Sequence, residues 1–220
     1  MTDILIIPDI HGRTFWKEPC SNWKGKIVFL GDYLDPYSYE NISFEDALNN
    51  FKDIIQFAKN NSDCILLIGN HDLGYIFPNN YNCTQISRHQ THAEATKLFN
   101  ENSSLFKVFY KINSYIFSHA GIQEQWLKFN QLELNHLDTN ILNINPDILS
   151  QCPFSRGGWN QYGSCVWEDA RFFDPGNIKE YQIFGHTQLL NAFITNKWAC
   201  LDCRKAFILK DNKITEFKNN

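Results

Sequence analysis

The 220-residue sequence has no excess of basic residues, because its 20 Lys and Arg are outnumbered by 24 Asp and Glu and the net charge is −4. A broad nucleic-acid footprint normally needs a basic surplus, so the composition disfavours nucleic acid as a partner. No run approaches the roughly 18 apolar residues of a membrane span. The apolar run Ile4–Ile7 is too short for a signal peptide and lacks a basic flank. We therefore expect a cytoplasmic protein that does not enter a membrane.

The chain also lacks Gly/Ser-rich or Pro-rich linkers, repeats and low-complexity blocks. Its length suits one well-filled domain, so a single domain over residues 1–220 is expected. The seven cysteines are an odd number, and without a secretory signal we expect reduced, mostly buried thiols. Cys200 and Cys203 form a lone CxxC, which is a weak metal or redox signal, and two small residues in a strand are the simpler interpretation.

Hydrophobic patterning predicts strands alternating with helices early in the chain and mostly strands late in it. Ser43 has the character of a helix N-cap, and apolar residues at helical spacing follow it up to Ala58. Further helices are expected over residues 88–100 and 123–134. Strands are expected over residues 3–8, 26–30, 64–68, 105–110, 115–118, 182–184, 192–195, 197–201, 206–209 and 213–217. The pattern favours a layered α/β domain whose ligand site lies at the carboxyl ends of strands.

Polar residues are placed in a regular way relative to these strands. Five times a hydrophobic run ends and is followed at once by a metal-capable side chain beside a small residue. The five segments are DIHG (9–12), GDYLD (31–35), GNHD (69–72), SHAG (118–121) and GHT (185–187). Each alone is commonly an ordinary turn, but five in succession, each after a strand, favour a common functional site.

The residue types in these segments point to a particular kind of metal site. Carboxylate, imidazole and amide oxygen together suit Mn, Fe or Zn rather than Ca. No cysteine takes part, which argues against a structural zinc site. The candidates are too many for one ion and suit two ions that share a carboxylate. Two such ions clamp a phosphate and activate a water molecule.

The set DxH, GDxxD, GNH, HAG and GH resembles the calcineurin-like metallophosphoesterase superfamily over residues 9–187. Within it the details are similar to the phosphoprotein phosphatase branch, which includes bacterial serine/threonine phosphatases and symmetrical diadenosine tetraphosphate hydrolases. The ending GHTQ lacks the second His of GHxH, which favours this branch over phosphodiesterases and nucleases. The resemblance implies a four-layer αββα sandwich of two mixed β-sheets flanked by helices.

The resemblance also implies roles for individual residues. Asp9, His11 and Asp32 would hold one divalent ion; Asp32 would bridge to a second held with Asn70, His119 and His186. A hydroxide bridging the ions would attack the phosphorus atom, and Mn is the ion expected in vitro, with Fe or Zn as alternatives. His71 would protonate the leaving oxygen, with Asp35 as its partner. An imidazole beside a carboxylate has a raised pKa, so it can stay protonated near neutrality.

Phosphate oxygens also need cationic donors, and the sequence has only five arginines. Arg156 is the first candidate, because its surroundings resemble an arginine- and tryptophan-bearing stretch that precedes GHT in bacterial members of the branch. Arg171 is the second candidate and Arg13 the third. The branch usually carries GDxxDRG, whereas Pro36 follows here, so the arginine of that loop is missing. His89 and His92 could face the same cleft, although a pair of surface histidines is the simpler interpretation.

The leading functional hypothesis is a phosphomonoesterase, either a serine/threonine or a dual-specificity protein phosphatase. The alternative is hydrolysis of a dinucleoside polyphosphate such as diadenosine tetraphosphate, because aromatic residues near Arg156 and Arg171 could stack on bases. A third hypothesis is a catalytically inactive scaffold, but the retained ligands and the His71–Asp35 pair argue against it. The partner would be a phosphoprotein or a nucleotide. The sequence leaves the physiological substrate, the native metal and the oligomeric state open.

Overall fold

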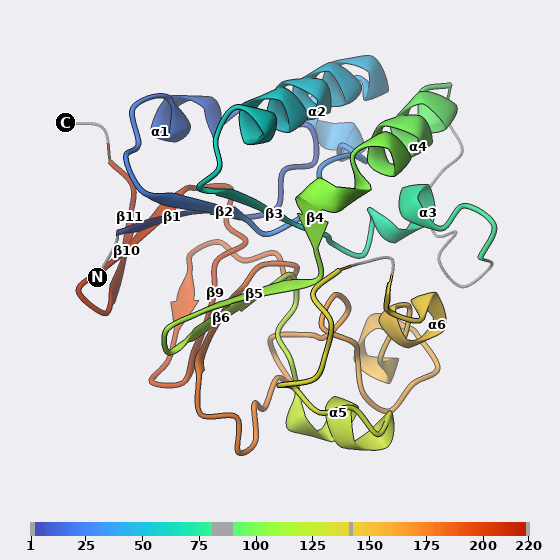
Figure 1. Ribbon diagram of the computed structural model, residues 1–220, viewed down its shortest axis with the longest axis vertical. Helices are drawn as coiled ribbons and strands as arrows, with labels where there is room; N and C mark the ends of the chain where they lie inside the picture. Colours follow the sequence, from blue (N-terminus) through green and yellow to red (C-terminus); the bar gives the residue numbers. More distant parts are fainter. Residues whose placement is uncertain (1–2, 81–89, 141–142, 219–220) are drawn as a thin grey trace.

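The computed structural model describes residues 3–80, 90–140 and 143–218, which form two mixed β-sheets packed face to face (Figure 1). The six-stranded sheet has the order β11 (Lys213–Glu216), β10 (Phe207–Lys210), β1 (Ile4–Ile7), β2 (Lys26–Phe29), β3 (Cys64–Leu67), β4 (Phe106–Lys107). The five-stranded sheet has the order β5 (Phe109–Ile112), β6 (Tyr115–Ser118), β7 (Tyr181–Phe184), β9 (Trp198–Cys200), β8 (Phe193–Ile194). Strands β1 to β4 run parallel, as do β6, β7 and β9.

Side-chain alternation along the strands builds two cores. In β1, Leu5 and Ile7 point to the outer face and pack with the helix α2 (Phe44–Lys59). Ile4 and Ile6 point to the opposite face and pack between the two sheets. Because successive side chains of a strand face opposite ways, a strand whose two faces are both covered must be apolar throughout. All four residues of β1 are buried, as this argument requires.

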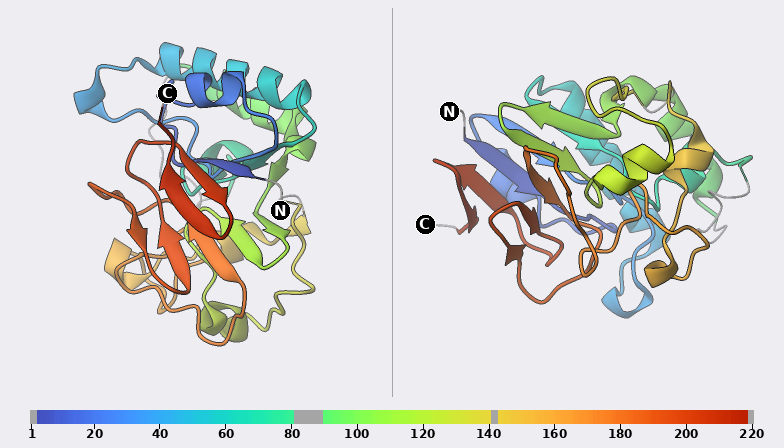
Figure 2. Two further views of the ribbon diagram at one scale, coloured as in Figure 1. Left: turned by 90° about the vertical axis from the view of Figure 1, so that its left-hand side faces the viewer. Right: turned by 90° about the horizontal axis from the view of Figure 1, so that it is seen from below.

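Helices cover both outer faces of the pair of sheets (Figures 1 and 2). The six-stranded sheet is covered by α1 (Lys17–Ser21), α2 and α4 (His92–Glu101), while α3 (Leu73–Ile76) follows β3. On the side of the five-stranded sheet lie α5 (Glu124–Phe129), α6 (Pro146–Leu149) and long loops. The helix α2 begins as expected, because the Ser43 hydroxyl accepts a hydrogen bond from the Asp46 N–H. The expected layered arrangement of two mixed sheets flanked by helices is confirmed.

Two predicted elements differ from the observed ones. The expected strand over 105–110 is two strands in different sheets, because the Val108 N–H leaves the ladder to bond the Thr139 carbonyl at 2.9 Å. The expected helix over 123–134 ends at Phe129, because Gln131 adopts a left-handed backbone conformation with φ 55°. The Leu132 N–H then bonds back to the Leu127 carbonyl at 2.8 Å, which closes the helix.

None of the helices in the described part of the chain has the length and apolar character that a bilayer span requires. Six of the seven cysteines lie within the described residues, and all six are free thiols. Five of these six are buried, and they include both members of the CxxC pair.

Candidate active site

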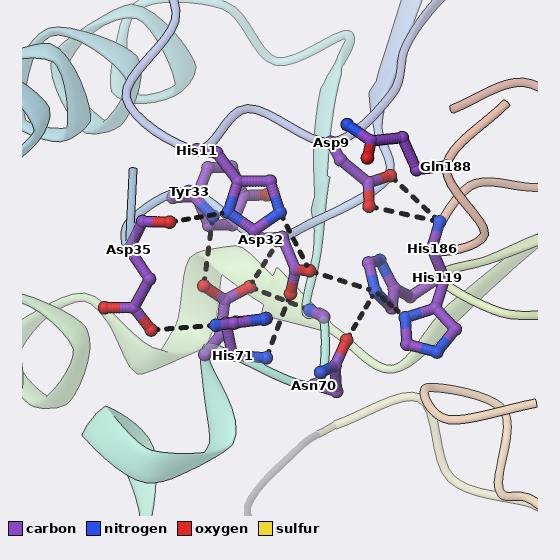
Figure 3. A network of polar contacts seen from close by, with 12 residues as sticks. Asp9, His11, Asp32, Tyr33, Asp35, Asn70, His71, His119, His186 and Gln188 are labelled. Carbon is purple, nitrogen blue, oxygen red and sulfur yellow. Dashed lines mark hydrogen bonds and ion pairs between the residues drawn. The ribbon is translucent and has the colours of Figure 1, made fainter. Parts of the chain in front are cut away.

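Residues from the ends of five parallel strands meet at one edge of the two sheets (Figure 3). From the six-stranded sheet, Asp9 follows β1, Asp32 follows β2 and Asn70 follows β3. From the five-stranded sheet, His119 comes directly after β6 and His186 lies two residues beyond β7. The carboxyl ends of parallel strands share one edge of a sheet, and here the edges of both sheets face each other. The segments expected from the sequence therefore converge.

The backbone is strained where it delivers these side chains. His11, Asp32, Asp35 and His186 all have positive φ, at 44°, 53°, 57° and 63°. This left-handed conformation is uncommon for residues with a Cβ, although Asp and His adopt it more readily than most. Gly69 makes the close approach possible, because a Cβ there would lie 2.0 Å from Asp32 Oδ1. Such strain is concentrated at functional sites, and four strained residues in one cluster support a functional role.

Asp32 stands at the centre of the cluster. Its Oδ2 lies 3.4 Å from His11 Nε2 and 3.4 Å from His119 Nε2. Its Oδ1 accepts a hydrogen bond from the His71 backbone N–H at 3.0 Å. One carboxylate oxygen therefore faces two imidazoles that come from different sheets.

Hydrogen bonds to backbone carbonyls orient both imidazoles. The Nδ1–H of His11 donates to the carbonyls of Leu34 and Asp35, both at 3.0 Å. The Nδ1–H of His119 donates to the carbonyl of Leu30 at 2.7 Å. Because a carbonyl only accepts, the proton of each neutral ring is on Nδ1 and the lone pair of Nε2 faces the centre. This is the tautomer that a metal ligand requires.

Atoms that can serve as metal ligands converge on the second half of the cluster. His119 Nε2 lies 3.0 Å from Asn70 Oδ1 and 3.2 Å from His186 Nδ1. The other ring nitrogen of His186, Nε2, is buried with no hydrogen-bond partner. Lone pairs that face one another repel unless a proton or a cation lies between them. Carboxylate, imidazole and amide oxygen are donors that Mn, Fe and Zn accept, so the residues fit a divalent ion.

Among the residues that the structure describes, two three-residue groups have ligand atoms within 4.8 Å of one another, and they share Asp32. One group is Asp32, His119 and His186, and the other is His11, Asp32 and His71. The shared carboxylate fits the expected pair of ions. Asp9, which the sequence analysis placed on the first ion, is not in either group. Its two carboxylate oxygens accept the His186 backbone N–H, both at 3.1 Å.

The charges of the cluster shift its pKa values strongly. Burial alone would raise the pKa of Asp32, but the charges of His119 and His71 outweigh it and hold that pKa well below its usual value. Burial alone would lower the pKa of His119, but Asp32 and Asp9 raise it to about 10. Burial and the neighbouring His119 hold the pKa of His186 well below its usual value. The same negative field that attracts a proton to His119 attracts a divalent cation.

His71 forms a pair with Asp35 beside the cluster. His71 Nδ1 donates to Asp35 Oδ2 at 2.9 Å, and the Tyr75 hydroxyl donates to Asp35 Oδ1 at 2.5 Å. Burial lowers the pKa of His71, but Asp32 and the bonded Asp35 carboxylate together raise it to about 9. The His71 side chain is one-third exposed, so its Nε2 is within reach of a substrate. This pair is expected from the sequence, and the structure brings its two members together.

Arg156 lies next to the second half of the cluster. Its Nη2 donates to the hydroxyl of Thr187 at 2.6 Å, one residue beyond His186, and its Nε lies 3.4 Å from Asp169 Oδ2. Arg171 pairs with the same Asp169 carboxylate at 2.5 Å, but its side chain is 64% exposed. Thr187 and Asp169 therefore hold Arg156 beside the cluster, whereas Arg171 extends into solvent.

Arg13 is engaged by other groups. Its Nε and Nη2 bind both oxygens of Glu40, at 2.8 and 3.0 Å, and its Nη1 donates to the Asp9 carbonyl at 3.2 Å. All three guanidinium nitrogens thus have a protein acceptor. A phosphate contact from Arg13, which the sequence analysis ranked third, would have to compete with these bonds.

Sequence reasoning missed two residues that hold the cluster in place. Asp72 accepts hydrogen bonds from the backbone N–H groups of Asp32, Tyr33 and Gly69, at 2.9, 3.1 and 2.7 Å. It directly follows His71, so its place in the GNHD segment was a usable signal. Tyr75, which bonds Asp35, lies inside α3 and carries no signal of its own.

The pair of histidines expected on one side of a helix is only partly described. The His92 ring stacks on that of Tyr75, with a centroid distance of 5.0 Å. Arg88 and His89 lie outside the described residues.

The strand ends of the two sheets thus present one carboxylate, Asp32, between the imidazoles of His11 and His119, an arrangement that suits a metal-dependent hydrolase. The chain matches the calcineurin-like phosphoesterase family over residues 2–189, and it belongs to that family. No curated protein sequence matches it.

Solved structures show the same fold. A cold-active protein-tyrosine phosphatase from a psychrophilic Shewanella species has a TM-score of 0.61 at 17% identity, covering 98% of this chain and 77% of that one. A protein serine/threonine phosphatase from Saccharomyces cerevisiae has a TM-score of 0.54 at 13% identity, covering 99% of this chain and 80% of that one. At such low identity the likeness extends to the fold alone.

Proposed function

We propose that this chain is a protein phosphatase that hydrolyses phosphomonoesters with the help of two divalent metal ions. The observation that carries the proposal is the position of Asp32 Oδ2, 3.4 Å from the Nε2 atoms of both His11 and His119. Membership of the calcineurin-like phosphoesterase family supports it.

In the proposed site, Asp9, His11 and Asp32 would hold one ion. Asp32, Asn70, His119 and His186 would hold the second, and Mn is the ion we expect to support activity in vitro. Two such ions would activate the attacking water and neutralise the charge on the phosphate. The residues themselves supply rigid support, because carbonyls and strand ends fix the direction of each imidazole before an ion arrives.

His71 is the proposed general acid. Its Nδ1–H is fixed by the Asp35 carboxylate, so its Nε2–H is the proton available to the oxygen of the leaving group. Asp35 orients the ring and raises its pKa, and Tyr75 holds Asp35 in turn. The charged form of the imidazole is therefore favoured at neutral pH, as an acid requires.

Arg156 is the proposed donor to the phosphate oxygens. Thr187 and Asp169 restrain its guanidinium beside His186. A planar guanidinium offers two parallel N–H groups, which match two oxygens of a phosphate. Arg171 is the second candidate, and we expect a smaller contribution from it because its side chain is exposed. Arg13 is the third, and we expect a smaller contribution from it because it is paired with Glu40.

The phosphorylated group is proposed to be a protein side chain. The two fold neighbours named above are described as a protein-tyrosine and a protein serine/threonine phosphatase. Serine/threonine or dual specificity is therefore the leading proposal.

A second candidate function is the hydrolysis of a dinucleoside polyphosphate such as diadenosine tetraphosphate. The observation that favours it is a set of aromatic side chains close to Arg156 and Arg171 in the chain that remain exposed. Phe154, Trp159 and Phe172 are exposed by 65%, 90% and 66%. Exposed rings of this kind stack on nucleobases.

One substrate panel in Mn separates these functions. It contains matched phosphoserine, phosphothreonine and phosphotyrosine peptides, diadenosine tetraphosphate and a bis-aryl phosphodiester. We expect inorganic phosphate from the phosphopeptides and little turnover of the diester. Release of two ADP from diadenosine tetraphosphate, with no phosphate from the peptides, would overturn the first proposal in favour of the second.

A further inference from the structure

Asp202 is a buried carboxylate beside the cluster that the site described above does not use. It lies two residues beyond the end of β9, and β9 is the strand next to β7, after which His186 follows. Its carbonyl accepts the Leu189 N–H at 2.8 Å, so the segment after β9 is tied to the segment after His186. The residue is 3% exposed, and its Oδ1 is buried without a hydrogen-bond partner.

Gly185, the residue directly after β7, lies between the side chains of Asp9 and Asp202. A Cβ on Gly185 would lie 2.1 Å from Asp9 Oδ1 and 3.8 Å from the Cβ of Asp202. Burial and the charge of Asp9 raise the pKa of Asp202 to about 8, and Asp32 adds to the rise while Arg13 and His119 oppose it. Three carboxylates thus share one buried region.

The cations of the protein do not balance this charge. The guanidinium of Arg13 binds Glu40 with two nitrogens and the Asp9 carbonyl with the third. His119 faces Asp32 and Asn70 with its Nε2. A buried carboxylate without a compensating cation or hydrogen-bond donors is driven toward its neutral form, and a cation bound nearby favours the charged form again.

The side chain of Asp202 differs from that of Asp72, which is a buried carboxylate with a structural role. Asp72 is also buried, and its two oxygens accept three backbone N–H groups. That is how a carboxylate holds loops together. The buried Oδ1 of Asp202 accepts no hydrogen bond, so it does not hold a loop in this way.

We propose that Asp202 is an anionic positioning residue of the metal centre, whose charge strengthens the binding of a divalent cation at the side of Asp9. Its negative charge adds to the electrostatic field next to Asp9, which attracts the cation. Asp202 is not itself one of the proposed ligands. The inference rests on the proposed metal site and adds to it a residue that none of the five sequence segments contains.

The test compares Asp202→Asn with the wild type in two measurements: Mn binding by calorimetry, and melting temperature with EDTA and with saturating Mn. Asparagine keeps the shape of the side chain and removes its charge. We expect Mn affinity at one site to fall at least tenfold. We also expect the melting temperature in EDTA to change little, because burial and Asp9 raise the pKa of Asp202 to about 8, while the rise on adding Mn becomes smaller. Asp211→Asn, an exposed residue in the β10–β11 turn, should change neither quantity.

Several results would overturn the proposal. Wild-type Mn affinity in Asp202→Asn would overturn this inference alone, and so would a lower melting temperature in EDTA with an unchanged rise on adding Mn. An unfolded apoprotein in both Asp202→Asn and Asp202→Ala would assign a structural role instead. A wild-type protein that binds no Mn would overturn the proposed function as well, so the two failures are distinguishable.

Discussion

Replacing His71 by asparagine tests whether this side chain acts as the general acid or binds a metal ion. The structure allows both roles, because His71 Nδ1 bonds Asp35 at 2.9 Å, while His71 also lies in a possible ligand group with His11 and Asp32. If His71 is the acid, the variant keeps both ions and loses rate by roughly 10²–10⁴, the usual contribution of general acid catalysis. This corresponds to about 3–5 kcal/mol of transition-state stabilisation, at about 1.36 kcal/mol per tenfold.

The assay measures kcat in Mn on aryl phosphates whose leaving groups have different pKa values, together with metal content by mass spectrometry. The rate loss should be large for a poor leaving group and small for a good one, because a good leaving group departs without a proton. His136→Asn is the matched control, since the His136 side chain is 78% exposed and pairs only with Glu133 among the contacts the structure gives it. A variant that loses one ion, or that loses rate equally on all substrates, would refute the acid role.

Three further predictions follow from the same geometry. Asp32→Asn should lose both ions, because its Oδ2 faces both halves of the cluster; retention of two ions in metal analysis would contradict the bridging role. Arg156→Ala should raise KM about 10- to 100-fold, because a charged hydrogen-bond donor is lost. Arg171→Ala should change KM less than about threefold. Equal effects of the two variants on KM in steady-state kinetics would contradict this ranking. Ser43→Ala should destabilise the fold by about 1 kcal/mol in urea denaturation, because the cap of α2 is lost, and an unchanged midpoint would contradict the assigned cap.

Much of the fold could be predicted from the sequence, because its signals are local. Short apolar runs located the strands, and the Ser43 cap with its apolar stripe located α2. The split between β4 and β5 could not be predicted, because it depends on a bond from Val108 to Thr139, which lies far along the chain. Likewise the end of α5 is set by the left-handed backbone conformation of Gln131. Glutamine has no strong preference for this conformation, so the end of the helix could not be predicted.

The metal-capable residues could be predicted because each stands immediately after a strand and beside a small residue. The residues that support them could not, since their roles arise from contacts between distant segments. Tyr75 acts on Asp35 from inside a short helix, and the ion pair with Glu40 engages Arg13. Asp202 follows a strand as the ligands do, but only the fold reveals that its neighbour across Gly185 is Asp9.

The central claim is that two cations share the Asp32 carboxylate. Anomalous diffraction from crystals of the wild-type protein grown with Mn tests it most directly. The account predicts two anomalous peaks roughly 3.5–4 Å apart, one on the side of His11 and the other between His119 and His186, with Asp32 between them. A single peak, or two peaks that do not both contact Asp32, would contradict it.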